Sequence, residues 1–149
     1  MVSTSAHLTP RERIATRKLM WVGPLMIVVV ALVNLVVRSF AVSFFGVSSS
    51  FLYLQAPVII ITTIVFLVLT LLAFVLVGRV SRHPVRSFRI LGGIALVVSF
   101  LNPLLQLADH WLPATGMNLP IFWTMIVIHI VSAFIAVNLL TTLAVERAR

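Results

Sequence analysis

The sequence predicts an all-α membrane protein, a four-helix transmembrane bundle with its N-terminus and its C-terminus in the cytoplasm. The first observation is composition: of 149 residues, 61% are hydrophobic and only 9% are charged. A soluble domain is about half apolar and about a quarter charged, and a chain of this size cannot hide so much apolar surface from water. The second observation is that the apolar residues fall into four runs, each near the roughly 20 residues that cross the hydrocarbon. A soluble enzyme and a disordered chain are therefore excluded.

The third observation is the distribution of positive charge. Eleven Lys and Arg residues face three acids, which gives a net charge of +8. Ten of them precede the first run, separate the second run from the third, or follow the fourth: Arg11, Arg13, Arg17, Lys18, Arg79, Arg82, Arg86, Arg89, Arg147 and Arg149. Short basic segments stay in the cytoplasm. Both termini of this multi-pass protein are therefore predicted to be cytoplasmic.

The basic residues have two further interpretations. Arg79, Arg82, Arg86 and Arg89 are predicted to contact anionic lipid headgroups, with topology alone as the simpler explanation. No nucleic-acid partner is expected, because the basic segments carry few interleaved aromatics and no known binding motif.

Along the chain, residues 1–18 form a cytoplasmic segment in which Thr9-Pro10 can begin a short helix through Arg17. A single transmembrane domain follows over 19–145, and 146–149 form a cytoplasmic tail. The predicted spans are about 19–41, 56–77, 88–107 and 119–144. The first span also resembles a signal peptide cleaved after Ala41, but its long leader and Arg38 beside the cleavage point argue against removal.

Catalytic and cofactor chemistry has few candidate residues in this sequence. There is no cysteine, and the three acids, Glu12, Asp109 and Glu146, all lie outside the cores of the spans. Among the histidines only His129 falls inside a span, so neither a metal cluster nor a bis-histidine haem is expected. We therefore predict no catalytic residues, no metal, no cofactor and no enzymatic activity.

Polar side chains within a span are costly in lipid, so they are the candidate site residues. Five of them gather toward the predicted outer half of the membrane: Asn34, Arg38, Asn102, Gln106 and His129. If the first, third and fourth spans pack together, these residues line one cavity that opens outward, with Asp109 at its rim. Such a cavity would suit an anionic headgroup or a small polar ligand.

Each of these residues also has a purely structural interpretation. Arg38 can reach the headgroups or pair with Asp109. Asn102 precedes Pro103 and can satisfy backbone groups that a proline kink leaves unpaired, and His129 can form a hydrogen bond across a helix interface. The threonines and serines of the spans are interpreted as contacts between helices.

The chain resembles a bacterial family known as domain of unknown function 6069, from about Trp21 to Leu143. Three segments carry the resemblance: Ala31-Leu-Val-Asn34-Leu, Ser99-Phe-Leu-Asn102-Pro103-Leu and Ile128-His129-Ile-Val-Ser-Ala133. Asn102 departs from the pattern, in which a small residue is expected before the proline. The resemblance implies a small four-helix integral protein of the bacterial inner (plasma) membrane and marks Pro103 and His129 for testing, but it implies no substrate.

Two functions follow as hypotheses. The first is a non-enzymatic structural or regulatory partner of another membrane component, because binding through helix packing needs no catalytic residues; a homo-oligomer belongs to the same hypothesis. The alternative is a binder or transporter of a small ligand or an anionic headgroup, which would use the five candidate residues.

Overall fold

The computed structural model describes residues 12–108 and 116–147. Within them the chain forms β1 (Glu12–Ile14), α1 (Thr16–Phe45), the 3₁₀ turn η1 (Leu52–Leu54), α2 (Ala56–Val80), α3 (Pro84–Ser99), α4 (Leu101–Ala108), α5 (Leu119–Leu143) and β2 (Val145–Arg147). Four helical segments are long and apolar enough to cross a membrane, with α3 and α4 together forming the third. The prediction of an all-α bundle with four spans is confirmed at this level.

The helix ends follow the sequence closely. Proline lies in the first turn of α2, α3 and α5, where a missing N–H costs nothing. Gly46 ends α1 with a φ of 62°, a left-handed conformation that favours glycine. The side chain of Asn118 caps α5 by accepting a hydrogen bond from the backbone N–H of Ile121 at 2.9 Å.

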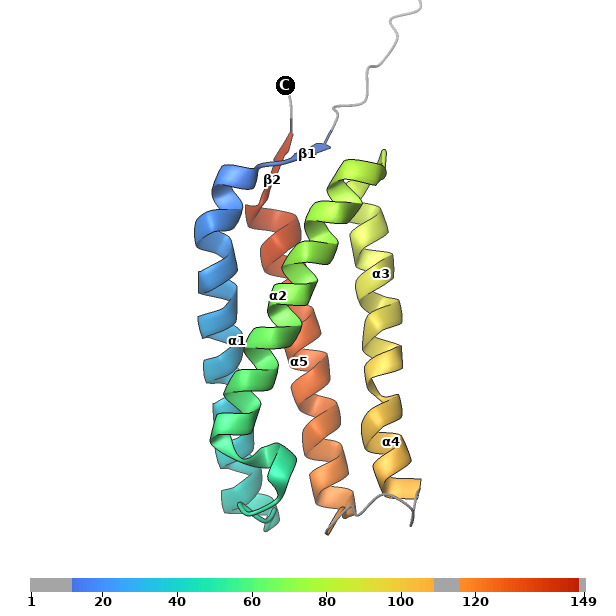
Figure 1. Cartoon of the computed structure of the whole chain (residues 1–149). Coiled ribbons are helices and arrows are strands. Elements are labelled where there is room, and N and C mark those ends of the chain that lie inside the picture. The colour runs from blue at the N-terminus through green and yellow to red at the C-terminus, as the bar shows by residue number, and fades with distance from the viewer. Residues whose placement is uncertain (1–11, 109–115, 148–149) are drawn as a thin grey trace, which may run out of the picture.

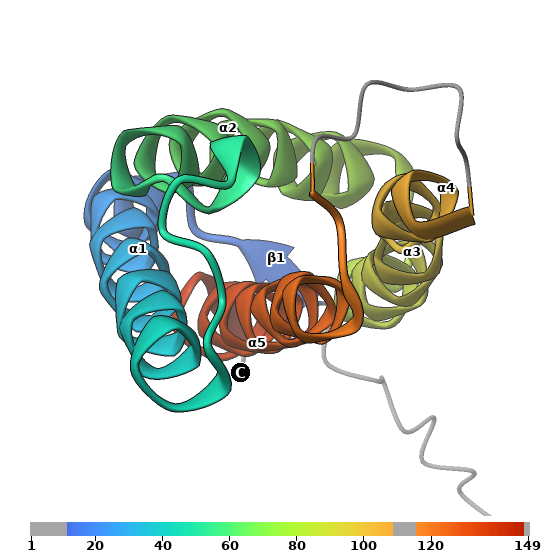
Figure 2. The ribbon, with the colours of Figure 1, turned by 90° about the horizontal axis from the view of Figure 1, so that it is seen from below.

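The four long helices form a ring in the order α1, α2, α3, α5, so that α1 and α3 lie diagonally opposite each other (Figure 2). The condition set for the predicted outward-opening cavity, that the first, third and fourth spans pack together, is therefore met only for the contacts of the fourth span with the other two. Helix α5 packs against both α1 and α3, and α2 closes the ring on the other side.

Both ends of the described chain lie at one end of the bundle, here called the terminal end, together with the turn between α2 and α3 (Figure 1). The opposite end, here called the loop end, holds η1 and the start of α5. Strands β1 and β2 pair in antiparallel fashion at the terminal end, with Glu12 opposite Arg147. The expected short helix through Arg17 is wrong for residues 12–15, because the backbone there pairs with β2. Glu146 and Arg147, the first two residues of the predicted tail, belong to this ribbon.

Two groups of buried side chains hold the bundle. The first lies toward the terminal end and includes Met26, Leu140 and the rings of Phe74 and Phe88, whose centroids are 4.8 Å apart. The second lies toward the loop end and includes Leu54, Ile121 and Met125. Many large apolar side chains point outward instead, as lipid contact requires. Examples are Val36, Phe44, Phe66, Leu76, Val97 and Phe134.

Candidate functional site

A partly open cavity of about 400 Å³ lies among the helices, lined by residues of both buried groups. Helices α2, α3 and α5 supply most of its wall, α1 contributes Val30 and Asn34, and η1 contributes Tyr53 and Leu54 at the loop end. Along α3 and α4 the lining extends from Phe88 to Asn102, which at about 1.5 Å per residue corresponds to roughly 20 Å. The cavity is therefore long and narrow, and its volume suits a small organic ligand.

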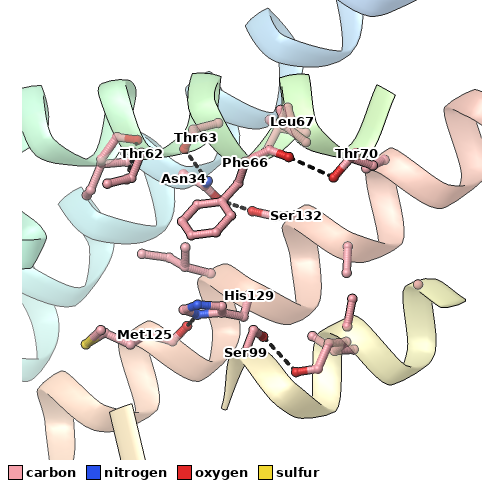
Figure 3. A pocket seen from close by; sticks show the side chains of 18 of the residues that line it. Asn34, Thr62, Thr63, Phe66, Leu67, Thr70, Ser99, Met125, His129 and Ser132 are labelled. Atoms are coloured by element: carbon pink, nitrogen blue, oxygen red, sulfur yellow. Dashed lines mark hydrogen bonds between the residues drawn. The ribbon is translucent and has the colours of Figure 1, made fainter. Parts of the chain in front are cut away.

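A hydrogen-bonded bridge crosses the bundle beside this cavity (Figure 3). The amide nitrogen of Asn34 donates to the hydroxyl of Thr63 at 3.2 Å, and its amide oxygen accepts from the hydroxyl of Ser132 at 3.1 Å. Asn34 is 2% exposed. Because an unpaired amide in lipid is costly, the two partners explain how it is accommodated, and they join α1 to α2 and α5.

His129 lies on α5 in the wall of the cavity (Figure 3). Its Nδ1 is 2.6 Å from the carbonyl oxygen of Met125, one turn earlier in the same helix. The ring of Phe100 meets the imidazole edge-on, with centroids 6.5 Å apart. The expected hydrogen bond across a helix interface is therefore not the one that His129 forms in the described structure, because its ring bonds to its own helix.

Asn102 and Gln106 form a pair on α4. The amide nitrogen of Gln106 donates to the side-chain oxygen of Asn102 at 3.0 Å. Asn102 lines the cavity near the loop end, whereas Gln106 is buried elsewhere. Within the described residues the side-chain oxygen of Gln106 has no hydrogen-bond partner. The helix is interrupted at Phe100, one turn before Pro103, as a missing backbone donor predicts. Asn102 does not repair this break, because its hydrogen bond is to Gln106.

Arg38 lies outside the cavity. Its Nε donates to the carbonyl oxygen of Leu54, and so ties α1 to η1. Since Tyr53 and Leu54 form part of the wall, Arg38 positions one end of the cavity without facing its interior. The expected pairing with Asp109 concerns a residue outside the described ranges.

Three of the five predicted residues, Asn34, Asn102 and His129, therefore line one cavity, and two, Arg38 and Gln106, do not. Sequence reasoning missed the contribution of α2, which supplies Thr62, Thr63 and Phe66. The adjacent pair Thr62-Thr63 in an otherwise apolar helix was the available signal, but it was interpreted only as a contact between helices.

Among the described residues, no group of three or more His, Asp or Glu side chains is close enough together to hold a metal ion. The fold and the site together define a multi-pass helical membrane protein with a partly open, mainly apolar cavity. Comparisons with protein-family models, with curated proteins and with solved structures give no match.

Proposed function

We propose that this chain is a non-enzymatic protein of the bacterial inner membrane that binds a small lipid-like ligand inside its helical bundle. The observation that carries the proposal is the cavity itself. It is long, its wall is mostly apolar, and a few polar groups from α1, α2 and α5 converge at its middle. Ligand sites typically combine an apolar wall with a few placed polar groups that fix orientation.

The proposal includes the topology. Arg17, Lys18, Arg79, Arg82, Arg86 and Arg89 all lie toward the terminal end of the bundle. The positive-inside rule therefore supports a cytoplasmic location for this end and for both termini. The exposed Arg79, Arg82, Arg86 and Arg89 would then face the anionic lipid surface.

Membership in the domain of unknown function 6069 family is part of the same proposal. Each of the three segments that carry the resemblance contributes to the cavity wall: Asn34 from the first, Ser99 and Asn102 from the second, and His129 and Ser132 from the third. The cavity is thus the feature that unites these separate segments.

The test is the lipid that the protein retains. The protein is purified in a mild detergent, and its lipids are extracted and compared by mass spectrometry with those of the host membrane. We expect one neutral lipid species to be enriched in the protein. Leu96→Trp should abolish the enrichment because Leu96 lines the cavity, whereas Val97→Trp, one residue away and 66% exposed, should retain it.

No enrichment in the natural protein, or equal enrichment in both variants, would count against the cavity as the ligand site. The second candidate function, a structural or regulatory partner of another membrane component or a homo-oligomer, rests on the exposed ring cluster of Phe40, Phe44 and Phe45 on α1. A stoichiometric second polypeptide that co-purifies, with no enriched lipid, would favour that function.

A further inference from the structure

Most hydroxyl groups in the cavity wall can accept a hydrogen bond from a ligand but cannot donate one. Thr62 donates its hydroxyl hydrogen to the carbonyl of Val58 at 2.7 Å, and Ser99 donates to the carbonyl of Leu96 at 2.7 Å. Two further hydroxyls follow the same pattern: Thr70 donates to Phe66, and Ser132 donates to Asn34. A hydroxyl has one hydrogen and two lone pairs, so each of the four can only accept a further hydrogen bond.

The imidazole of His129 likewise offers a ligand only a hydrogen-bond acceptor. A carbonyl oxygen only accepts, so the 2.6 Å contact with Met125 requires the hydrogen to be on Nδ1 of the imidazole. In the neutral ring, Nε2 then holds a lone pair and is the acceptor. Since the ring lies in the cavity wall, this nitrogen is the strongest acceptor available to a ligand at the middle of the cavity.

The donors of the wall are few. Asn102 and Tyr53 have donor groups, but they lie at the loop end of the cavity. Thr63 accepts from Asn34 and keeps its own hydroxyl hydrogen, and the Asn34 amide keeps a second N–H hydrogen, but these two side chains are only 9% and 2% exposed. The lining includes no Asp, Glu, Lys or Arg among the described residues. A charged ligand group would therefore be desolvated without a counter-charge, which is expensive.

We propose that the ligand is a neutral lipid alcohol, whose hydroxyl donates to Nε2 of His129 while its chain extends along the apolar wall formed by α2, α3 and α5. The inference rests on the proposed function and adds the chemical class of the ligand. A carbonyl-bearing lipid such as a quinone or an ester has no hydrogen to donate, so it would leave Nε2 of His129 unpaired.

The test uses three probes with the same chain: 1-hexadecanol, its methyl ether and hexadecane. The purified natural protein is loaded with tritiated 1-hexadecanol, and each unlabelled probe competes for binding. The ether keeps the oxygen but has no hydrogen to donate. We expect the alcohol to compete about tenfold better than the ether, which corresponds to one hydrogen bond, and the ether to match hexadecane.

Variants assign the effect to one side chain. His129→Phe keeps a ring but removes the acceptor, and should lower the affinity for 1-hexadecanol to that for the ether. His129→Gln keeps an acceptor and should restore part of the preference. The matched control is His83→Phe, which makes the same change at an exposed histidine outside the cavity and should leave competition unchanged.

The outcomes separate the two proposals. Equal competition by alcohol and ether would overturn the inference about the donor but leave an apolar ligand site in place. No saturable binding of 1-hexadecanol and no competition by any probe would overturn the proposed function as well. An alcohol preference that persists in His129→Phe would show that His129 is not the acceptor and would overturn the assignment.

Discussion

At the scale of single residues, two polar side chains of the cavity wall, Asn34 and His129, use their hydrogen-bonding groups differently. Asn34 bonds to side chains of two other helices, so its role is to hold α1, α2 and α5 in one arrangement. His129 uses one nitrogen within its own helix and leaves the other for the cavity. Both side chains are costly to bury in a bilayer. Asn34 bonds to other helices and so has a structural role, whereas His129 leaves one ring nitrogen for a ligand and so is the proposed binding residue.

Replacing Asn34 tests its proposed role in holding three helices together. We expect Asn34→Ala to lower the free energy of unfolding by about 1–3 kcal/mol, because two hydrogen bonds between helices are lost and the hydroxyls of the buried Thr63 and the half-buried Ser132 each lose a partner. The measurement is unfolding by sodium dodecyl sulfate from mixed micelles, followed by circular dichroism. Asn138→Ala is the matched control, since Asn138 bonds only to the carbonyl of Phe134 in its own helix. Equal losses in the two variants would contradict the role given to Asn34.

The sequence identified three polar residues that line the cavity, but it did not predict what each of them contacts. Asn34, Asn102 and His129 were found because a polar residue in an apolar span is conspicuous. Arg38 was assigned to the cavity because helix periodicity places it one turn from Asn34, yet its guanidinium reaches the carbonyl of Leu54 in η1. A contact with a loop backbone has no periodic signature, so composition and spacing could not reveal it.

At the scale of elements, the ribbon of β1 and β2 packs tightly on the helices at the terminal end. A Cβ atom placed on Gly78 of α2 would lie 2.0 Å from Cδ1 of Ile14, so the Ile14 side chain must move if a larger residue replaces this glycine. Gly93 of α3 has open space around it, with no heavy atom of another segment within 4 Å of such a Cβ.

Alanine at each position should therefore act in opposite directions. Gly93→Ala is expected to stabilise the protein by up to about 1 kcal/mol, because alanine is the better helix former. Gly78→Ala has the same gain but must displace Ile14, at a cost of about 1–3 kcal/mol, so a net loss is expected. The same unfolding assay measures both. Addition of Ile14→Ala should recover the loss from Gly78→Ala; a loss that persists in the double variant would place its cause outside this contact.

The ribbon could not be predicted from the sequence, for a physical reason. Its strands are three residues long, and each alone lacks the alternating pattern of a longer strand. Their pairing joins positions near the two ends of the described chain, so no local signal of a hairpin exists. The break between α3 and α4, by contrast, follows from Pro103 and was expected as a kink.

At the scale of the whole molecule, the bundle and its four spans follow directly from composition and from the lengths of the apolar runs. The order of the helices around the ring does not. Similar apolar faces give several helices equivalent packing choices, so the sequence did not show that α1 and α3 are diagonal or that α2 supplies one wall of the cavity.

The proposed topology can be tested with single cysteines, because the natural sequence has none to remove. Thr16 begins α1 at the terminal end, Ser49 lies between α1 and η1 at the loop end, and both are exposed. In intact cells a membrane-impermeant maleimide should label Ser49→Cys, whereas Thr16→Cys should be labelled only after the membrane is permeabilised. The reverse pattern would place the terminal end outside and would contradict the assignment from positive charge.

The pairing of β1 with β2 also fixes the order of events during synthesis of the chain. Glu12 is synthesised about 135 positions before Arg147, its partner in the ribbon. At roughly 5–20 residues per second, the first strand leaves the ribosome on the order of ten seconds before the second. Closure of the terminal end must therefore wait until α5 has crossed the membrane, and a chain whose last span fails to insert keeps an unpaired strand edge. The ribbon at the terminal end thus forms only in a chain whose last span has been inserted.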